Sequence, residues 1–167
     1  MLKPQDVMVL IHLVGEKPEW RYQRLAAELG MSTSEVHQAL RRAAESGLYE
    51  PESRQVFRHA LLEFIQHGLR YVYPAKRLPR CYGVPTAHSV APLADSIVAD
   101  PDDCVVWPCA QGASFGDGIE PLYRAAPAAA SRHPGLHRRL ALVDAIRVGR
   151  LRERELARRL LEVEFGV

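Results

Sequence analysis

The sequence predicts an α+β protein that is mainly helical, with helical regions at both ends and a small amount of sheet between them. Apolar residues recur every three or four positions within residues 4–68 and again within residues 136–163, which is the period of a helix buried along one side. Residues 74–134, between these regions, are rich in proline and glycine. A chain of 167 residues, 47% of them hydrophobic, can bury a substantial core.

Helix signals mark the N-terminal region. Pro4 suits the first position of a helix, and the apolar stripe that follows it predicts a helix over residues 4–14. A second helix, about two turns long, should end at Leu29, because Gly30 supplies the left-handed residue that commonly stops a helix. Another helix is predicted from Phe57 to Gly68.

A third helix is predicted between these by a capping box. Residues 32–35 read Ser-Thr-Ser-Glu, in which the serine hydroxyl and the glutamate carboxylate each satisfy a free backbone N–H at the helix start. This helix should end at Gly47. A short helix, a tight turn and a capped second helix form the arrangement that places the second helix in the major groove of duplex DNA.

Polar side chains on the outer side of this unit suit DNA recognition. A helix N-terminus favours phosphate, and hydrogen-bonding side chains on a rigid helix can read base edges. The candidates at the start of the second helix are Arg21, Gln23 and Arg24. The candidates on the turn and the third helix are Ser32, Thr33, Ser34, His37, Gln38, Arg41 and Arg42. The alternative for these residues is an ordinary solvated helix face.

The charge distribution gives little support to this interpretation. The formal net charge is +2, and residues 1–70 hold nine Lys and Arg against nine Asp and Glu. The positive excess lies in residues 132–167, with nine against five. A DNA-binding face in the N-terminal region would therefore depend on sorting charges onto one side.

Residues 24–36, together with Gly47-Leu48, resemble the winged helix-turn-helix transcription regulators of the MarR-like group. The resemblance covers residues 4–50 and implies a DNA-binding regulator with a basic β-hairpin wing directly after Gly-Leu. Tyr49–Ser53 is short and acidic instead. We therefore expect the wing at Leu69–Thr86, from strands at 69–73 and 81–86, with a basic tip formed by Lys76, Arg77 and Arg80. A solvated loop is the alternative.

Two further strands are expected in the middle of the chain, at Cys104–Trp107 and Ile119–Tyr123, separated by the glycine-bearing run Gln111–Gly118. Pro127 argues against a continuous helix through residues 125–130. Helices containing Leu136–Ile146 and Leu156–Val163 should form a C-terminal hairpin.

We thus expect three units: a winged helix-turn-helix-like domain at 1–86, an irregular β-containing segment at 87–134, and a helical hairpin at 135–167. The apolar stripes of the hairpin need a covering surface, and a homodimer would supply one.

A second resemblance extends over most of the chain. Residues 61–74, 83–87 and 142–150 resemble uncharacterised bacterial regulator-like proteins that often occur beside toxin-antitoxin or phage-defence genes. Together the resemblances imply a homodimeric, sequence-specific repressor of transcription that binds double-stranded DNA. The alternative is an antitoxin-like module that binds and masks a partner protein.

Other function classes receive no support from the sequence. Three cysteines at these spacings match no disulfide framework or paired CxxC site, so reduced thiols and no cofactor or metal are expected. Sets such as Cys81 with His88, or Cys104 and Cys109 with His133 or His137, lack diagnostic spacing. No phosphate-loop lysine or nucleophilic triad marks an enzyme. No apolar run approaches the roughly 18 residues of a membrane span, which favours a cytoplasmic protein.

Overall fold

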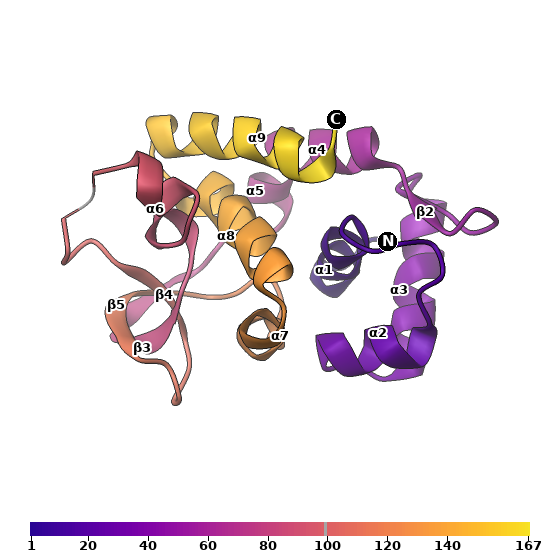
Figure 1. Cartoon of the computed structure of the whole chain (residues 1–167), viewed down its shortest axis with the longest axis horizontal. Coiled ribbons are helices and arrows are strands. Elements are labelled where there is room, and N and C mark those ends of the chain that lie inside the picture. The colour runs from indigo at the N-terminus through magenta and orange to yellow at the C-terminus, as the bar shows by residue number, and fades with distance from the viewer. Residues whose placement is uncertain (99) are drawn as a thin grey trace.

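The computed structural model describes residues 1–98 and 100–167. Figure 1 shows α1 to α3 at one end of the long axis, β3 to β5 at the other, α8 between them, and α4 and α9 along one side. The described elements are α1 (Pro4–Leu13), α2 (Tyr22–Leu29), α3 (Thr33–Glu45), β1 (Tyr49–Glu50), β2 (Gln55–Val56), α4 (Arg58–His67), α5 (Leu69–Val72), β3 (Arg77–Pro85), the 3₁₀ helix η1 (Ala87–Ser89), α6 (Leu93–Ser96), β4 (Val105–Pro108), β5 (Ser114–Ile119), α7 (Ala126–Arg132), α8 (Pro134–Val148) and α9 (Leu151–Phe165).

The N-terminal helices form where the sequence predicts them. α3 packs against α1 and α2, and the residues that it buries are Val36, Ala39, Leu40 and Ala43. Gly30 ends α2 with a φ of 65°, a left-handed conformation that glycine adopts without the steric cost of a Cβ.

A two-stranded hairpin follows α3 directly, which corrects the prediction that a helix comes next. β1 and β2 pair antiparallel, with Tyr49 opposite Val56. Arg54 takes a positive φ of 57° in their connection. Each strand has only two residues, too few to show the alternation of apolar and polar residues by which a strand is recognised.

The prediction of a β-hairpin over Leu69–Thr86 is wrong. Its first half is α5, in which the Tyr73 N–H donates to the Leu69 carbonyl over 2.8 Å, so a helical turn overrides the strand preference of its aromatic and β-branched residues. Its second half belongs to β3, whose partners are β4 and β5. Lys76 precedes β3, and Arg77 and Arg80 lie within it rather than at a hairpin tip.

β3, β4 and β5 each pair with the other two and close into a small barrel, antiparallel for both pairs of β3 and parallel between β4 and β5. The strand predicted at Cys104–Trp107 is confirmed as β4. The prediction for Ile119–Tyr123 is wrong, because β5 occupies the glycine-bearing run and ends at Ile119. A Cβ on Gly116 would lie 2.3 Å from the Cys104 carbonyl oxygen, so glycine here marks a close approach of two backbones.

α8 is the central helix of the molecule. Leu136 and every residue from Arg139 to Arg147 are buried, and α8 packs against α1, α7, α9 and η1. The predicted pairing of the two C-terminal helices is confirmed, but the chain itself covers much of their apolar surface. α7 corrects the prediction made from Pro127, since that proline lies in the first turn, where its missing N–H breaks no helical bond.

A buried carboxylate joins the barrel to α8. Asp144 accepts hydrogen bonds from Trp107 Nε1 (2.6 Å), the Thr86 hydroxyl (2.8 Å) and the Arg147 guanidinium (2.7 Å). Arg147 also donates to the carbonyl of Tyr73. A buried charge with partners on several sides is tolerated, and here it connects three parts of the chain.

The three cysteines are free thiols, as expected. Among the described helices, none has the length and apolarity needed to cross a lipid bilayer.

Candidate nucleic-acid interface

The connection between α2 and α3 is held by local hydrogen bonds. The Met31 N–H donates to the Ala26 carbonyl, and the Met31 side chain is buried. The capping box is confirmed: the Ser32 hydroxyl accepts from the Glu35 N–H over 3.1 Å, and the Glu35 carboxylate accepts from the Ser32 N–H over 2.7 Å. The hydrogen bond from the Ser32 N–H, together with the nearby Ser32 hydroxyl, holds the pKa of the Glu35 carboxyl below its ordinary value. The start of α3 is therefore fixed relative to α2.

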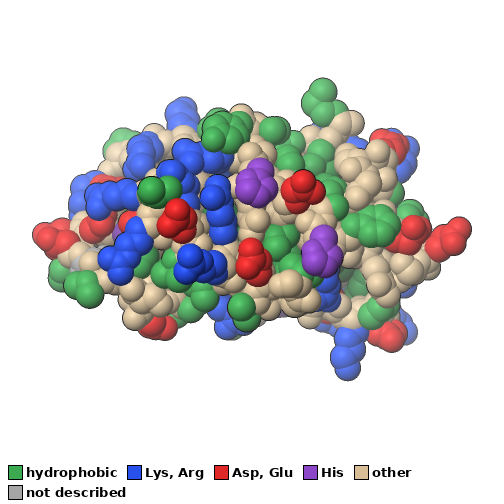
Figure 2. All heavy atoms as spheres, turned by 90° about the horizontal axis from the view of Figure 1, so that it is seen from above, with side chains coloured by type: hydrophobic (Ala, Val, Ile, Leu, Met, Phe, Trp, Pro, Cys, Tyr) green, Lys and Arg blue, Asp and Glu red, His purple; other side chains and the backbone are tan. Residues whose placement is uncertain are grey.

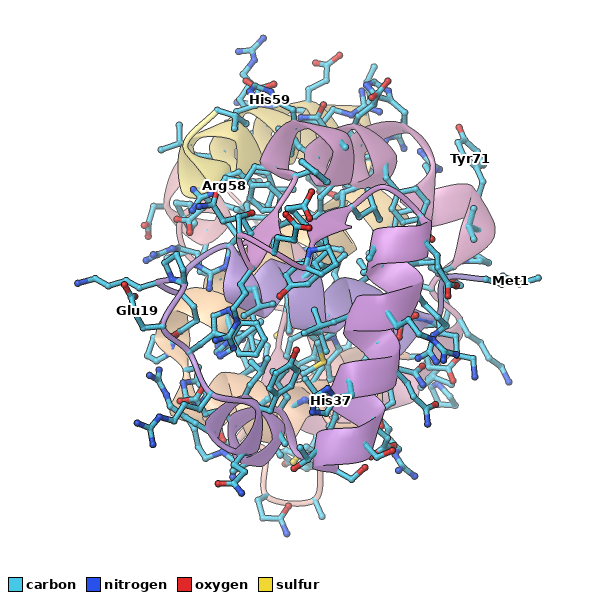
Figure 3. The ribbon with its side chains drawn as sticks, turned by 90° about the vertical axis from the view of Figure 1, so that its right-hand side faces the viewer. Met1, Glu19, His37, Arg58, His59 and Tyr71 are labelled. Carbon is cyan, nitrogen blue, oxygen red and sulfur yellow. The ribbon has the colours of Figure 1, made fainter. Side chains whose placement is uncertain are left out.

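The outer side of α3 presents polar side chains on a helix whose inner side is buried. Figure 3 shows α3 running along the end of the molecule that faces the viewer. Ser34, Gln38 and Arg41 are exposed, and their spacing places them on one side of the helix. Arg41 is 75% exposed, and its Nε atom lies 3.6 Å from the Glu45 carboxylate. Thr33 is half-buried at the first helical position.

His37 braces α3 against the start of α2. Its ring stacks on Tyr22, with 3.7 Å between centroids and 13° between planes, and Tyr22 meets Trp20 edge to face. In Figure 3, His37 lies on the side of α3 that faces α2. His37 therefore combines a packing contact with an exposed position.

Arg42 does not belong to the outer face, which corrects its place among the DNA-binding candidates. Its guanidinium makes two hydrogen bonds, of 2.6 and 2.8 Å, to the Asp6 carboxylate in α1. The Arg42 side chain is 12% exposed and Asp6 is completely buried. This ion pair fastens α3 to α1.

Arg24 is also engaged within the chain. It donates to Glu28 over 2.7 Å and to Glu16 over 2.9 Å, although its side chain remains 56% exposed. These carboxylates offset its charge. Arg21 and Gln23 at the start of α2 are exposed, so Arg21 remains the accessible cation there.

Lys76, Arg77 and Arg80 do not join the other candidates. Arg77 and Arg80 lie in β3, which Figure 1 places at the opposite end of the molecule from α3. Arg77 contacts the Val148 carbonyl, and Arg80 the Asp102 carbonyl and the Asp117 carboxylate. Cations also gather elsewhere: Figure 2 shows Lys and Arg side chains concentrated in the left half of the face formed by α4 and α9.

The hairpin after α3 is acidic. Glu52 is exposed in the β1–β2 connection and Glu50 is half-buried beside it. Its one arginine, Arg54, folds inward over the Trp20 ring at 4.0 Å and donates to the Trp20 carbonyl over 2.7 Å. The hairpin therefore offers no accessible arginine or lysine to a phosphate.

A cluster of titratable side chains, His12, Glu16 and Glu28, lies between α1 and α2. The Nε2 atom of His12 lies 2.9 Å from a Glu28 carboxylate oxygen and 4.0 Å from one of Glu16. Burial lowers the pKa of His12, against the opposing effect of the two carboxylates. The sequence gives little indication of this group beyond a His and a Glu four residues apart at the end of the first helix.

A second polar site lies between the barrel and the turn that joins α8 to α9. This cavity, of about 120 Å³, is lined in part by Arg77, His88, Asp103 and Asp117. His88 Nε2 lies 2.6 Å from the Asp103 carbonyl oxygen, so a backbone contact engages this nitrogen.

Comparisons with known protein families, characterised proteins and solved structures found no match to this chain.

Proposed function

We propose that α1 to α3 and the β1–β2 hairpin form a winged helix-turn-helix that binds duplex DNA, and that the chain is a transcription regulator acting as a repressor. The observation that carries the proposal is the pairing of a buried inner side of α3 with an outer side that presents Ser34, Gln38 and Arg41. A rigid, capped helix with such side chains can enter the major groove.

Three of the exposed side chains have a stated chemical role in this proposal. Gln38 can pair bidentately with adenine and Arg41 with guanine, each contact contributing about 1–3 kcal/mol of discrimination against other bases. Arg21, beside the N-terminus of α2, binds a phosphate. A homodimer would place two α3 helices on successive major grooves and read a palindromic operator.

The acidic hairpin limits how the DNA is held. Glu50 and Glu52 disfavour close approach of a phosphate, and Arg24 and Arg54 are engaged within the chain. The proposed complex therefore makes few phosphate contacts. Because each neutralised phosphate contributes about −0.9 to the slope of log K against log salt, the salt dependence should be shallow.

The test is fluorescence anisotropy with labelled duplexes from the region upstream of the protein's own coding sequence and with scrambled duplexes of equal composition. We expect preference for an upstream duplex, which Gln38→Ala and Arg41→Ala each reduce. Matched controls are Gln111→Ala and Arg152→Ala, exposed residues outside the α2–α3 unit. Equal affinity for all duplexes, unchanged by the α3 variants, would contradict the proposal.

The second candidate function is a module that binds and masks a partner protein. It is favoured by the acidic hairpin and by a shallow surface cavity of about 640 Å³ beside it, lined by Val56, Phe57, Ala60 and Val167 among others. Absence of duplex binding even at low salt would favour this function over the first.

A further inference from the structure

We propose that His12, Glu16 and Glu28 form a binding site for a divalent transition-metal ion of the Zn²⁺ class. Among the described residues, this is the one group of three or more His, Cys, Asp or Glu side chains with ligand atoms close enough to share an ion. The cysteine and histidine sets considered from the sequence do not gather in this way.

The spacing of the ligand atoms fits a single ion. Nitrogen and oxygen ligands lie about 2.0–2.2 Å from Zn²⁺, so two ligands of one ion are separated by at most about 4.4 Å. His12 Nε2 lies 2.9 Å from Glu28 and 4.0 Å from Glu16, and all the ligand atoms lie within 4.8 Å of one another. Small side-chain rotations therefore suffice to complete the site.

The ligand types select the class of metal. One imidazole and two carboxylates form a nitrogen and oxygen set, which suits Zn²⁺ and neighbouring divalent ions, whereas oxygen-only sites suit Ca²⁺ or Mg²⁺. Three protein ligands leave a fourth position for water, as in open zinc sites.

The burial of His12 is the second observation. The side chain is 3% exposed, and Nε2 points at the two carboxylates. Its other ring nitrogen, Nδ1, is buried without a hydrogen-bond partner. The two carboxylates face Nε2, and the His133 ring contacts the His12 ring edge to face with 5.2 Å between centroids, so the ring is already turned toward the proposed ion.

The guanidinium of Arg24 occupies the place of a cation in this structure. It bridges Glu16 and Glu28, the two carboxylates that would bind the metal. Because its side chain is 56% exposed and exposed ion pairs are weak, Arg24 can leave the carboxylates for solvent. A divalent ion and Arg24 therefore compete for the same two carboxylates.

This competition connects the metal site to the proposed DNA-binding surface of α2 and α3, a consequence that rests on the proposed function. Arg24 lies on α2 one turn after Arg21, and metal binding would release its guanidinium for a phosphate. Affinity for duplex DNA should then rise with metal, and Arg24→Ala should remove that rise while metal binding itself persists.

The test is isothermal titration of the chelator-treated full chain with Zn²⁺ in the absence of DNA, together with Co²⁺ absorption spectra. We expect one equivalent per chain, without the near-ultraviolet charge-transfer band that thiolate ligands give. Glu28→Gln and His12→Gln should lose at least the roughly 10- to 100-fold in affinity that follows from removing a ligand's hydrogen-bonding neighbour. Arg24→Ala should bind more tightly than wild type, because its competitor is gone.

Controls are Glu45→Gln and His59→Gln, exposed residues of the same types that are not part of the cluster, and circular dichroism of every variant. Should His12→Gln fail to fold, Glu28→Gln and Arg24→Ala decide the result, because they replace residues that are less buried than His12. Wild-type affinity in folded Glu28→Gln, weaker binding in Arg24→Ala, or a thiolate band would each overturn the site. Metal binding without any duplex affinity would leave the site intact and contradict the proposed function alone.

Discussion

Arg41 and Arg42 are adjacent in the sequence and about 100° apart around α3, but they lie in contrasting environments. Arg41 is 75% exposed and has a loose contact with Glu45, whereas Arg42 is 12% exposed and makes two hydrogen bonds to a buried carboxylate. The outer side of α3 can therefore serve recognition, while the inner side supports the fold. A count of arginines on a helix overstates the charge that is available to DNA.

The largest expected effect tests the inner side. Arg42→Ala leaves the Asp6 carboxylate buried without its counterion, and breaking a buried pair in this way costs about 3–5 kcal/mol. Arg41→Ala should change stability by no more than about 0.5 kcal/mol, as is usual for exposed positions. Urea unfolding followed by circular dichroism measures both. Equal losses in the two variants would show that the comparison between the sides is mistaken.

The next effect separates phosphate binding from base reading. Arg21→Ala should weaken binding to every duplex and reduce the magnitude of the salt slope by about 0.9, since one phosphate contact is lost. Gln38→Ala should instead reduce discrimination by about 1–3 kcal/mol with little change in salt slope. Anisotropy titrations at several salt concentrations measure both quantities. A specificity change in Arg21→Ala would mean that this residue reads bases.

The contrast between Arg41 and Arg42 also shows which features of the fold the sequence could predict. The capping box at Ser32 and the inner stripe of α3 depend on neighbours a few residues apart, and both lie where predicted. The partner of Arg42 is 36 residues away in the sequence, and no local pattern indicates it. The same holds for Arg54, which folds onto Trp20 from 34 residues away.

The strands were harder to predict for a related reason. β5 depends on close backbone contacts at Gly116 with Cys104, so residues typical of a turn form a strand. β1 and β2 are too short to carry a periodic signal. Both failures concern pairing between segments, whereas the helices, which form their hydrogen bonds locally, were mostly placed correctly.

A smaller effect concerns the pH dependence of folding stability, through His12 in the last turn of α1. Burial lowers the pKa of His12 below its ordinary value of 6.5, so the unfolded chain binds a proton more readily than the folded chain does. His12 therefore costs no stability above pH 6.5, and stability falls as pH drops below 6.5, by at most about 1.4 kcal/mol per pH unit for one proton.

Urea unfolding between pH 7.5 and about 5 measures this slope. His12→Gln should flatten it. The lowered pKa of Glu28 acts in the same direction but at lower pH, because its contribution is lost only as pH falls below its ordinary value of 4.5. Glu28→Gln should therefore lower stability by a similar amount across that window and flatten the pH dependence only below it. An unchanged slope in His12→Gln would show that other groups carry the pH dependence.

The smallest effect returns to the outer side, at the hairpin that follows α3. If the β1–β2 hairpin lies along the DNA backbone, Glu52→Gln removes a repulsion and should tighten binding to all duplexes by about 0.2–1 kcal/mol, the scale of exposed charge interactions. The gain should fade at high salt, since exposed charges are screened.

Glu155→Gln, exposed on α9, is the matched control. Anisotropy at low and high salt measures the difference, and an equal gain in both variants would mean that only net charge changed. A gain confined to Glu52→Gln would place the hairpin against the duplex, so that the acidic connection, rather than a shortage of cations on α3, limits affinity.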